Sequence, residues 1–389
     1  MKQLNKIFLL ASFALVMFAF TSRADEAIDV NKDLVPGMAK PIPVNLSGFS
    51  GEALEVIQFD LYVQGFSFTT ADEAQYLLSG SANGNLTGRA SDRFNKAMLV
   101  NTSYNSGSLR RQAHWFVDDF LKAIGRKGLG QSKIAFKSAK GERGEIYVAD
   151  FDGGGAKPVT ADNAIVAAPS FVPGRLALYY TTYKNGNPDI WFHDLTSGAR
   201  NPVATFPGSN ISPAVSPDGS KVAMILSKSG AVDLYVANAS GKELRQLTRT
   251  KEDDSSPCWS PDGQWICFAT RSNGRRVLCK VPASGGSVQS IETRGISNPS
   301  EPDWSPDGKW IVFTAQMGGF EVCVVPATGG SATVLVSGED ASWSPNSRTV
   351  VYARRGGGHY TLSLLDVPTK QTKDISRLSG NNSQPSWAK

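Results

Sequence analysis

The chain has 389 residues, 41% of them hydrophobic and 19% charged, with a formal net charge of +5. This composition is typical of a soluble globular protein and argues against intrinsic disorder. Without residues 1–24, which we expect to be cleaved, 37 basic residues face 35 acidic ones. This near balance weakens the case for a nucleic-acid-binding protein.

The first 24 residues have the pattern of a secretory signal peptide. Lys2 and Lys6 precede an apolar run over residues 7–20, and Ser22 and Ala24 supply the small residues that a signal peptidase reads. The run is too short for a transmembrane anchor, which needs about 20 apolar residues. No lipobox cysteine follows it. We therefore expect a mature chain from Asp25 in the periplasm, with no membrane-spanning segment.

Residues 25–130 predict a small α/β domain. Apolar residues recur at helical spacing in "GEALEVIQFDLYVQGF" (51–66) and "LRRQAHWFVDDFLKAIG" (109–125). Between them "QYLLSGS", "LTGRASDRF" and "KAMLVNTSY" alternate as strands do. The Gly-rich segment 125–131 is the predicted boundary with the next domain.

From residue 131 onward the chain repeats. A bulky residue recurs every 39 to 45 positions, at Phe171, Val215, Trp259, Trp304, Trp343 and Trp387. All but Trp343 lie two residues after a proline, and all but Trp387 precede a tight turn. Turns such as "SPDG" follow the bulky residue, and then come two or three short apolar runs separated by Gly-containing turns. Four short strands in about 40 to 45 residues indicate a β-propeller blade.

The ends of the chain give the number of blades. The terminal "QPSWAK" is a first strand without a second, whereas residues 132–160 read as a second, third and fourth strand without a first. Together they complete one blade, and five full units lie between them. We predict a six-bladed propeller over 131–389, closed by pairing of the C-terminal strand with the first blade, which removes exposed sheet edges.

Several residue types fit more than one function. Trp259, Trp304, Trp343 and Trp387 could stack on sugars or bases, but the strand they occupy favours packing between blades. Asp218, Asp262 and Asp307 are explained by their turns rather than by metal sites. The candidates for a cation near the channel mouth are Asp253 and Asp254, although we predict no metal or cofactor.

The four cysteines allow different states in an oxidising compartment. A three-residue turn at 272–274 would place Cys267 opposite Cys279, whereas a two-residue turn at 262–263 would place Cys258 opposite Cys267. Only one of these pairings can hold, and Cys323 has no clear partner. We favour buried free thiols.

The whole arrangement resembles the TolB family, the periplasmic propeller proteins of the Tol-Pal system. The resemblance rests on "ISPAVSPDGSKVAMILSKSGAVDLYVANASGKELRQLT" (211–248). It rests also on the order of signal peptide, α/β domain, Gly-rich linker, six blades and final "PSW" strand. It covers nearly the whole mature chain. It implies a non-enzymatic scaffold that takes part in outer-membrane integrity, protein transport and constriction at cell division. Because a closed propeller needs no partner to be stable, we expect a monomer.

Members of this family bind the peptidoglycan-associated lipoprotein Pal through one propeller face. Carried over by position, the loops that form this face contain Ser209, Asn210, Ser212, Asp253, Asp254, Ser255, Asn298, Glu301, Glu339, Asp340 and Asn382. The family also engages the inner-membrane protein TolA through the first mature residues. Here "DEAIDVNKDLVPGMAKP" keeps little of that segment beyond a strand over Ala27–Val30, which puts the TolA contact in doubt.

The alternative is an exported propeller enzyme or binding protein that acts on a glycan or peptide in the central channel. The chain has no Gly-x-Ser-x-Gly nucleophile elbow, and its three histidines, His114, His193 and His359, lack metal-ligand spacing. We therefore predict no catalytic residues. Titratable groups that converge on a pocket would favour catalysis, whereas a broad polar rim favours a protein partner.

Overall fold

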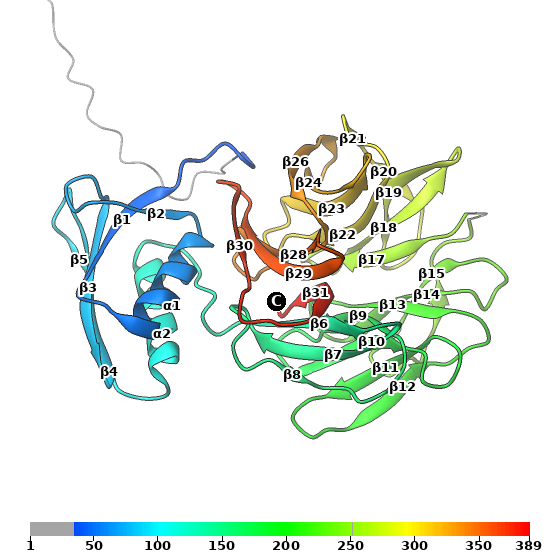
Figure 1. The fold of residues 1–389 in the computed structure, drawn as a ribbon. Helices are drawn as coiled ribbons and strands as arrows, with labels where there is room; N and C mark the ends of the chain where they lie inside the picture. The colour runs from blue at the N-terminus through cyan, green and yellow to red at the C-terminus, as the bar shows by residue number, and fades with distance from the viewer. Residues whose placement is uncertain (1–34, 251) are drawn as a thin grey trace, which may run out of the picture. The chain divides into compact units, whose positions relative to one another are not determined.

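The computed structural model describes residues 35–250 and 252–389, and its first part is a five-stranded sheet with two helices on one face (Figure 1). The sheet order is β2-β1-β3-β4-β5. The strands are β1 (Ile42–Ser47), β2 (Phe66–Phe68), β3 (Tyr76–Asn83), β4 (Asn85–Asp92) and β5 (Met98–Tyr104), and the helices are α1 (Gly51–Tyr62) and α2 (Leu109–Ala123). The predicted helices and β3 to β5 are confirmed. Strands β1 and β2 were not predicted, because one contains Pro43 and the other has only three residues.

The core of this part lies between the sheet and the helices. Phe116 and Phe120 of α2 are fully buried against Tyr76, Leu86 and Ala90 of the sheet. Helix α2 begins after Ser108, whose side chain accepts a hydrogen bond from the Arg111 N–H and so caps the helix. The apolar spacing that predicted this helix is therefore the face that packs on the sheet.

After the α/β part, the described residues form six four-stranded sheets, and each is named here as a blade. Blade 1 is β31 (Asn381–Trp387), β6 (Lys133–Lys140), β7 (Arg143–Asp150) and β8 (Lys157–Pro158); blade 2 is β9 (Val166–Phe171), β10 (Ala177–Thr182), β11 (Asp189–Asp194) and β12 (Arg200–Ala204); blade 3 is β13 (Asn210–Val215), β14 (Lys221–Leu226), β15 (Asp233–Asn238) and β16 (Arg245–Gln246). Blade 4 is β17 (Ser255–Trp259), β18 (Trp265–Ser272), β19 (Arg275–Pro282) and β20 (Gln289–Ile291); blade 5 is β22 (Pro299–Trp304), β23 (Trp310–Gln316), β24 (Phe320–Pro326) and β26 (Thr333–Ser337); blade 6 is β27 (Glu339–Trp343), β28 (Thr349–Gly356), β29 (His359–Asp366) and β30 (Gln371–Asp374). A short parallel pair, β21 (Thr293–Arg294) and β25 (Gly330–Ser331), links blades 4 and 5.

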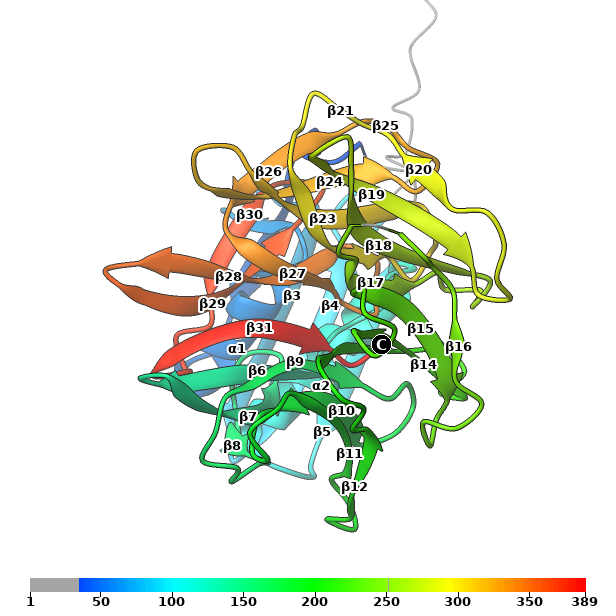
Figure 2. The same ribbon diagram turned by 90° about the vertical axis from the view of Figure 1, so that its right-hand side faces the viewer.

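The blades form a closed ring, as predicted. The first strand of each blade is its inner strand, and successive inner strands contact one another from β9 through β13, β17, β22 and β27 to β31, which in turn contacts β9. The C-terminal strand β31 pairs antiparallel with β6, with Trp387 opposite Ile134. Figure 2 shows this red strand beside the green strand β6. The first blade is thus completed by the last residues of the chain.

The repeated tryptophans pack in the core between blades, which confirms their predicted role. Trp259, Trp304, Trp343 and Trp387 are each 7% exposed or less. The turns that follow are held by the predicted aspartates, since Asp218 and Asp262 each accept a hydrogen bond from the backbone N–H two residues later, at 3.0 Å.

All four cysteines are buried and free, as favoured. The pairing of Cys267 with Cys279 was wrong, because Cys267 lies opposite Lys280 and Phe268 lies opposite Cys279. The hairpin has two central residues, Asn273 and Gly274, rather than three, and both have positive φ as the twist of a tight hairpin requires. Cys258 does lie opposite Cys267.

Trp387 tests the closure of the ring. We expect Trp387→Ala to lower the free energy of unfolding by about 3–5 kcal/mol, because it empties a buried site where the last strand meets blade 1. Trp265→Ala, at a half-buried position between blades 4 and 5 and away from the closing strand, serves as control and is expected to cost about 1 kcal/mol. Guanidinium unfolding measures both. Equal losses in the two variants would contradict the special role of the closing strand.

Candidate functional site

The ring has two ends, and the predicted site lies at one of them. The entry face is defined here as the end where the inner strands begin, and the turn face as the opposite end, where SPDG-type turns follow these strands. In blade 4, for example, Ser255 at the start of β17 pairs with Ala269, whereas Trp259 at its end pairs with Ile266, next to the turn. The predicted residues precede or begin inner strands, and so they belong to the entry face.

Each inner strand contains one β-bulge at the same place. In all six blades the register between the inner strand and the second strand shifts. The bulged residue has φ between 48° and 56°, at Ala168, Ser212, Ser256, Glu301, Asp340 and Gln384. Five of the six precede a proline, which lacks a backbone N–H and is tolerated in a sheet at a bulge. The repeated proline of the sequence thus marks a bulge.

The bulged residues line the central channel. A cavity of about 500 Å³ runs between the inner strands, and all six bulged residues contribute to its wall. Pro173, Pro217, Pro261 and Pro306 line it toward the turn face. Its charged residues come from blades 5 and 6 and from the C-terminus, with Glu301, Asp303, Asp340 and Lys389. The Lys389 ammonium donates a hydrogen bond to Asp303 at 2.6 Å.

Side chains of the bulges join neighbouring blades. The Asp340 N–H lies 3.3 Å from Glu301 Oε2, the Gln384 N–H donates to Asp340 Oδ2 at 3.2 Å, and the Ala168 N–H donates to Gln384 Oε1 at 3.1 Å. This chain of hydrogen bonds runs around one side of the channel from blade 5 to blade 2. It gives Glu301, Asp340 and Gln384 a structural role besides any contact with a ligand.

Asp340 is the most perturbed carboxyl group of the channel. Burial raises its pKa well above the usual value, and the neighbouring carboxylates of Glu301 and Glu339 raise it further.

Five channel-lining residues were not predicted, namely Ala168, Ser256, Gln384, Asp303 and Lys389. Ala168, Ser256 and Gln384 occupy the repeated position before the proline, and this repeat in the sequence would have identified them.

The structure divides the predicted residues into two groups. Asn210, Asp254 and Asn382 are at most 2% exposed. Asn210 donates to the carbonyls of Phe206 and Pro188 at 2.7 and 3.1 Å, and Asp254 accepts from Thr248 at 2.5 Å. These side chains hold the loops that lead into the inner strands.

The other predicted residues are accessible. Asp253 and Asn298 are exposed, and the remaining six are half-buried, namely Ser209, Ser212, Ser255, Glu301, Glu339 and Asp340. Ser212, Glu301 and Asp340 line the channel, whereas the other five lie outside its wall, just before or at the start of inner strands on the entry face. We call Ser209, Asp253, Ser255, Asn298 and Glu339 the rim; they come from the entry loops of blades 3 to 6.

Two further features concern possible metal ligands and membrane-spanning helices in the described residues. Over 35–250 and 252–389, no three His, Cys, Asp or Glu side chains are grouped as a metal ion would require. Asp254, a candidate ligand from sequence, uses its carboxylate on Thr248. Neither helix of this part is long and apolar enough to cross a membrane. The predicted signal peptide and the Ala27–Val30 strand lie outside the described residues.

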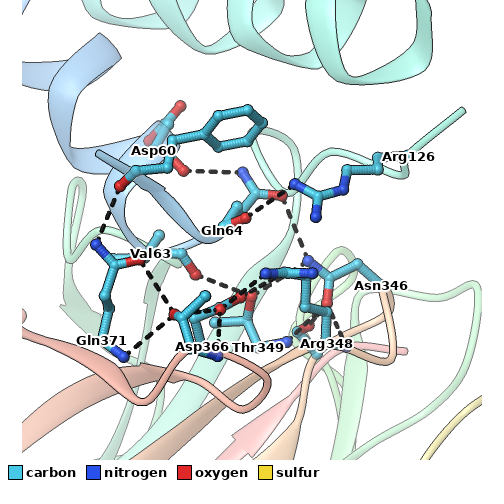
Figure 3. Close-up of polar contacts among 12 residues, drawn as sticks. Asp60, Val63, Gln64, Arg126, Asn346, Arg348, Thr349, Asp366 and Gln371 are labelled. Atoms are coloured by element: carbon cyan, nitrogen blue, oxygen red, sulfur yellow. Dashed lines mark hydrogen bonds and ion pairs between the residues drawn. The ribbon is translucent and has the colours of Figure 1, made fainter. Parts of the chain in front are cut away.

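The α/β part contacts the turn face. Figure 3 shows the end of α1 against blade 6. The Thr349 hydroxyl donates to the Val63 carbonyl at 3.1 Å, Asn346 donates to Gln64 Oε1 at 3.3 Å, and Gln371 donates to the Phe66 carbonyl at 3.0 Å. Asn346 belongs to the turn after β27. These contacts leave the entry face clear of the α/β part.

A buried charge cluster joins the helices to blade 1. His114 of α2 lies between two carboxylates, with Nδ1 2.6 Å from Asp60 of α1 and Nε2 3.6 Å from Asp152, which follows β7. Arg110 also contacts Asp152. Burial alone lowers the pKa of His114, but the two carboxylates outweigh it and raise this pKa to about 10. The imidazole is therefore charged at neutral pH and holds the two elements together.

The comparisons with a family model and with curated relatives give the TolB family. A model of the TolB β-propeller domain matches residues 120–389. The protein TolB homolog of Chlorobium luteolum is 31% identical over 100 residues, which are 25% of this chain and 23% of that protein. The Tol-Pal system protein TolB of Desulfosudis oleivorans is 29% identical over 104 residues, which are 26% and 24%. The matched segments thus span about a quarter of the length of these curated relatives.

A solved structure extends the similarity in fold. The crystal structure of TolB from Acinetobacter baumannii superposes with a TM-score of 0.82 at 22% identity, covering 92% of this chain and 98% of that one. At this identity the match shows that the fold is shared, including the α/β part before the propeller.

Asp340 gives a test of the channel electrostatics. Since its folded pKa is raised, ionisation of this carboxyl opposes folding once the pH exceeds the usual value of 3.8. Asp340→Asn keeps an oxygen acceptor for the Gln384 N–H. We expect this variant to unfold at a higher denaturant concentration than the parent at pH 7 and at the same concentration near pH 3. A variant that is less stable at pH 7 would contradict the assignment.

His114 predicts the opposite pH dependence. Because its folded pKa is raised to about 10, its contribution is complete below pH 6.5 and is lost as the pH rises toward 10. We expect His114→Gln to lower the free energy of unfolding by about 3–5 kcal/mol at pH 6, since it removes the ion-pair partner of the buried Asp60 carboxylate, whereas Asp152 keeps Arg110. The deficit should shrink toward pH 10. A deficit that is constant with pH would indicate that His114 acts only through packing.

Proposed function

This chain belongs to the TolB β-propeller family, and from this premise we propose that it is a periplasmic scaffold of a Tol-Pal system. In this proposal it binds a peptidoglycan-associated lipoprotein through the entry face of the propeller. It catalyses no reaction. Its role is to support outer-membrane integrity and envelope constriction at cell division.

The rim carries the proposal. Ser209, Asp253, Ser255, Asn298 and Glu339 come from the entry loops of four successive blades, so that one rigid ring presents them on the same face. Loops positioned by a rigid scaffold are the usual place for a binding surface. A rim of this kind suits a folded partner that lies across the channel, while Ser212, Glu301 and Asp340 are reached by a segment that enters it.

The contacts of the α/β part are consistent with this assignment. They use the turn face of blade 6 and the end of β7 in blade 1, so they do not compete with a partner at the rim. A contact with a TolA-like protein through the first mature residues is a further part of the proposal. It concerns residues 25–34, which lie outside the described range.

The channel supports a second candidate. A cavity of about 500 Å³ falls in the range of small-ligand sites, and three carboxyl groups line it, those of Glu301, Asp303 and Asp340. A glycan or peptide ligand would place hydrogen-bond donors against them. In that case the chain would be an exported binding protein or enzyme, and the rim would contribute little to affinity.

A binding experiment separates the two. The mature chain and the double variant Asp253→Arg/Asn298→Trp are incubated with the soluble domain of the lipoprotein from the same organism, and the affinity is measured by calorimetry. We expect the variant to bind at least tenfold more weakly, because both exposed rim residues are replaced by larger ones and one charge is reversed.

A matched control uses the same replacements away from the rim. Asp72→Arg/Asn83→Trp changes two exposed residues of the α/β part, and we expect it to bind like the parent. No binding by the parent chain, or equal binding by both variants, would remove the rim assignment. The channel would then be screened with cell-wall glycans and peptides.

A further inference from the structure

The hairpins between the second and third strands of blades 4, 5 and 6 also lie at the entry face. In each of these blades the inner strand begins beside the end of the second strand, since Ser255 pairs with Ala269, Pro299 with Ala315 and Glu339 with Ala353. The tips of the three hairpins come directly after these paired residues, at 271–276, 316–320 and 354–359. We call these three tips the basic arc. None of their residues lines the channel cavity.

The basic arc has an unusual composition. Its sequences are "RSNGRR", "QMGGF" and "RRGGGH", which contain five arginines and no aspartate or glutamate. Met317 and Phe320, in the middle tip, are 38% and 42% exposed. The two arginine-bearing tips belong to the blades on either side. Exposed apolar side chains are thus flanked by positive charge on both sides.

The arginines of blade 4 lack internal partners. Arg271 lies directly opposite Arg276 in the β18–β19 ladder, and both are exposed. Like charges that face each other across a ladder are unfavourable. In the part of the chain that the structure describes, neither they nor Arg275 form an ion pair with a carboxylate. An external anion would relieve this repulsion.

The arginines of blade 6 are only weakly engaged. Arg354 pairs with Asp374 at 2.6 Å, but both side chains are about half exposed, so this pair is readily exchanged for another anion. The Arg355 guanidinium lies 5.9 Å from the centre of the Tyr360 ring. In Figure 2 the β28–β29 hairpin extends outward from the ring.

We propose that the basic arc binds the surface of a bilayer that contains anionic phospholipids, with the arginines on headgroup phosphates and Met317 and Phe320 in the interface. A planar partner can reach three separate tips at once. Apolar burial combined with attraction to anionic lipid is the usual basis of such peripheral binding. The proposal uses none of the rim residues.

Vesicle sedimentation tests it with the full mature chain. We expect binding to vesicles of phosphatidylethanolamine and phosphatidylglycerol at low salt, and none to vesicles of phosphatidylcholine. The variant Arg271→Gln/Arg275→Gln/Arg276→Gln should lower the partition coefficient roughly 100-fold. Phe320→Ser should lower it roughly tenfold. All these positions are exposed, and circular dichroism checks that the variants remain folded.

A control variant with the same change in net charge separates the arc from charge in general. Lys96→Gln/Lys122→Gln/Lys127→Gln removes three exposed cations of the α/β part and its linker, and it should bind like the parent. Equal loss in both triple variants, or no binding to anionic vesicles, would overturn the proposal. So would a triple-arginine variant that keeps vesicle binding and loses the lipoprotein domain, because the arc would then belong to the protein interface. If the parent chain binds anionic vesicles but not the lipoprotein domain, the proposed function fails and the bilayer proposal stands.

Discussion

The pairing of the last strand with the first blade is the interaction on which the rest of the structure depends. Strand β31 supplies the inner strand of blade 1, contacts both of its neighbours in the ring and buries Trp387. Only a closed ring holds six inner strands at fixed spacing around one channel. Because closure joins residues separated by nearly the whole propeller, it also makes the positions of all the entry loops depend on one contact.

Within that ring, a β-bulge in each inner strand determines the shape of the site. Each inner strand bulges at the residue with positive φ, five times before a proline, and the bulged residues form the wall of the channel. The blades are similar in backbone but differ in side chain at this position, from Ala168 to Glu301 and Asp340. Charge is therefore concentrated on one side of the channel. The α/β part is anchored at the other end by His114 and Asp152, and so the entry face is available for partners.

Much of the fold could be predicted because the sequence repeats. The regular spacing of Trp259 and its equivalents fixed the blades, and the incomplete units at both ends gave the closure. The side-chain roles were harder to predict. Asn210 and Asp254 look like exposed loop polar groups in the sequence, but in the folded chain both are buried. They are hydrogen-bonded to Phe206 and Thr248 of their own loops, and Asn210 also binds the Pro188 carbonyl of another loop. The cluster of Asp60, His114 and Asp152 combines three distant segments, and no local pattern indicates it.

The central claim is that the entry face binds a lipoprotein. Hydrogen exchange with mass spectrometry, carried out with and without the soluble lipoprotein domain, tests it over the whole described chain at once. The account predicts slower exchange in the loops that lead into β13, β17, β22 and β27, with no change in the turns that follow these strands. Protection confined to the turn face or to the α/β part would contradict it.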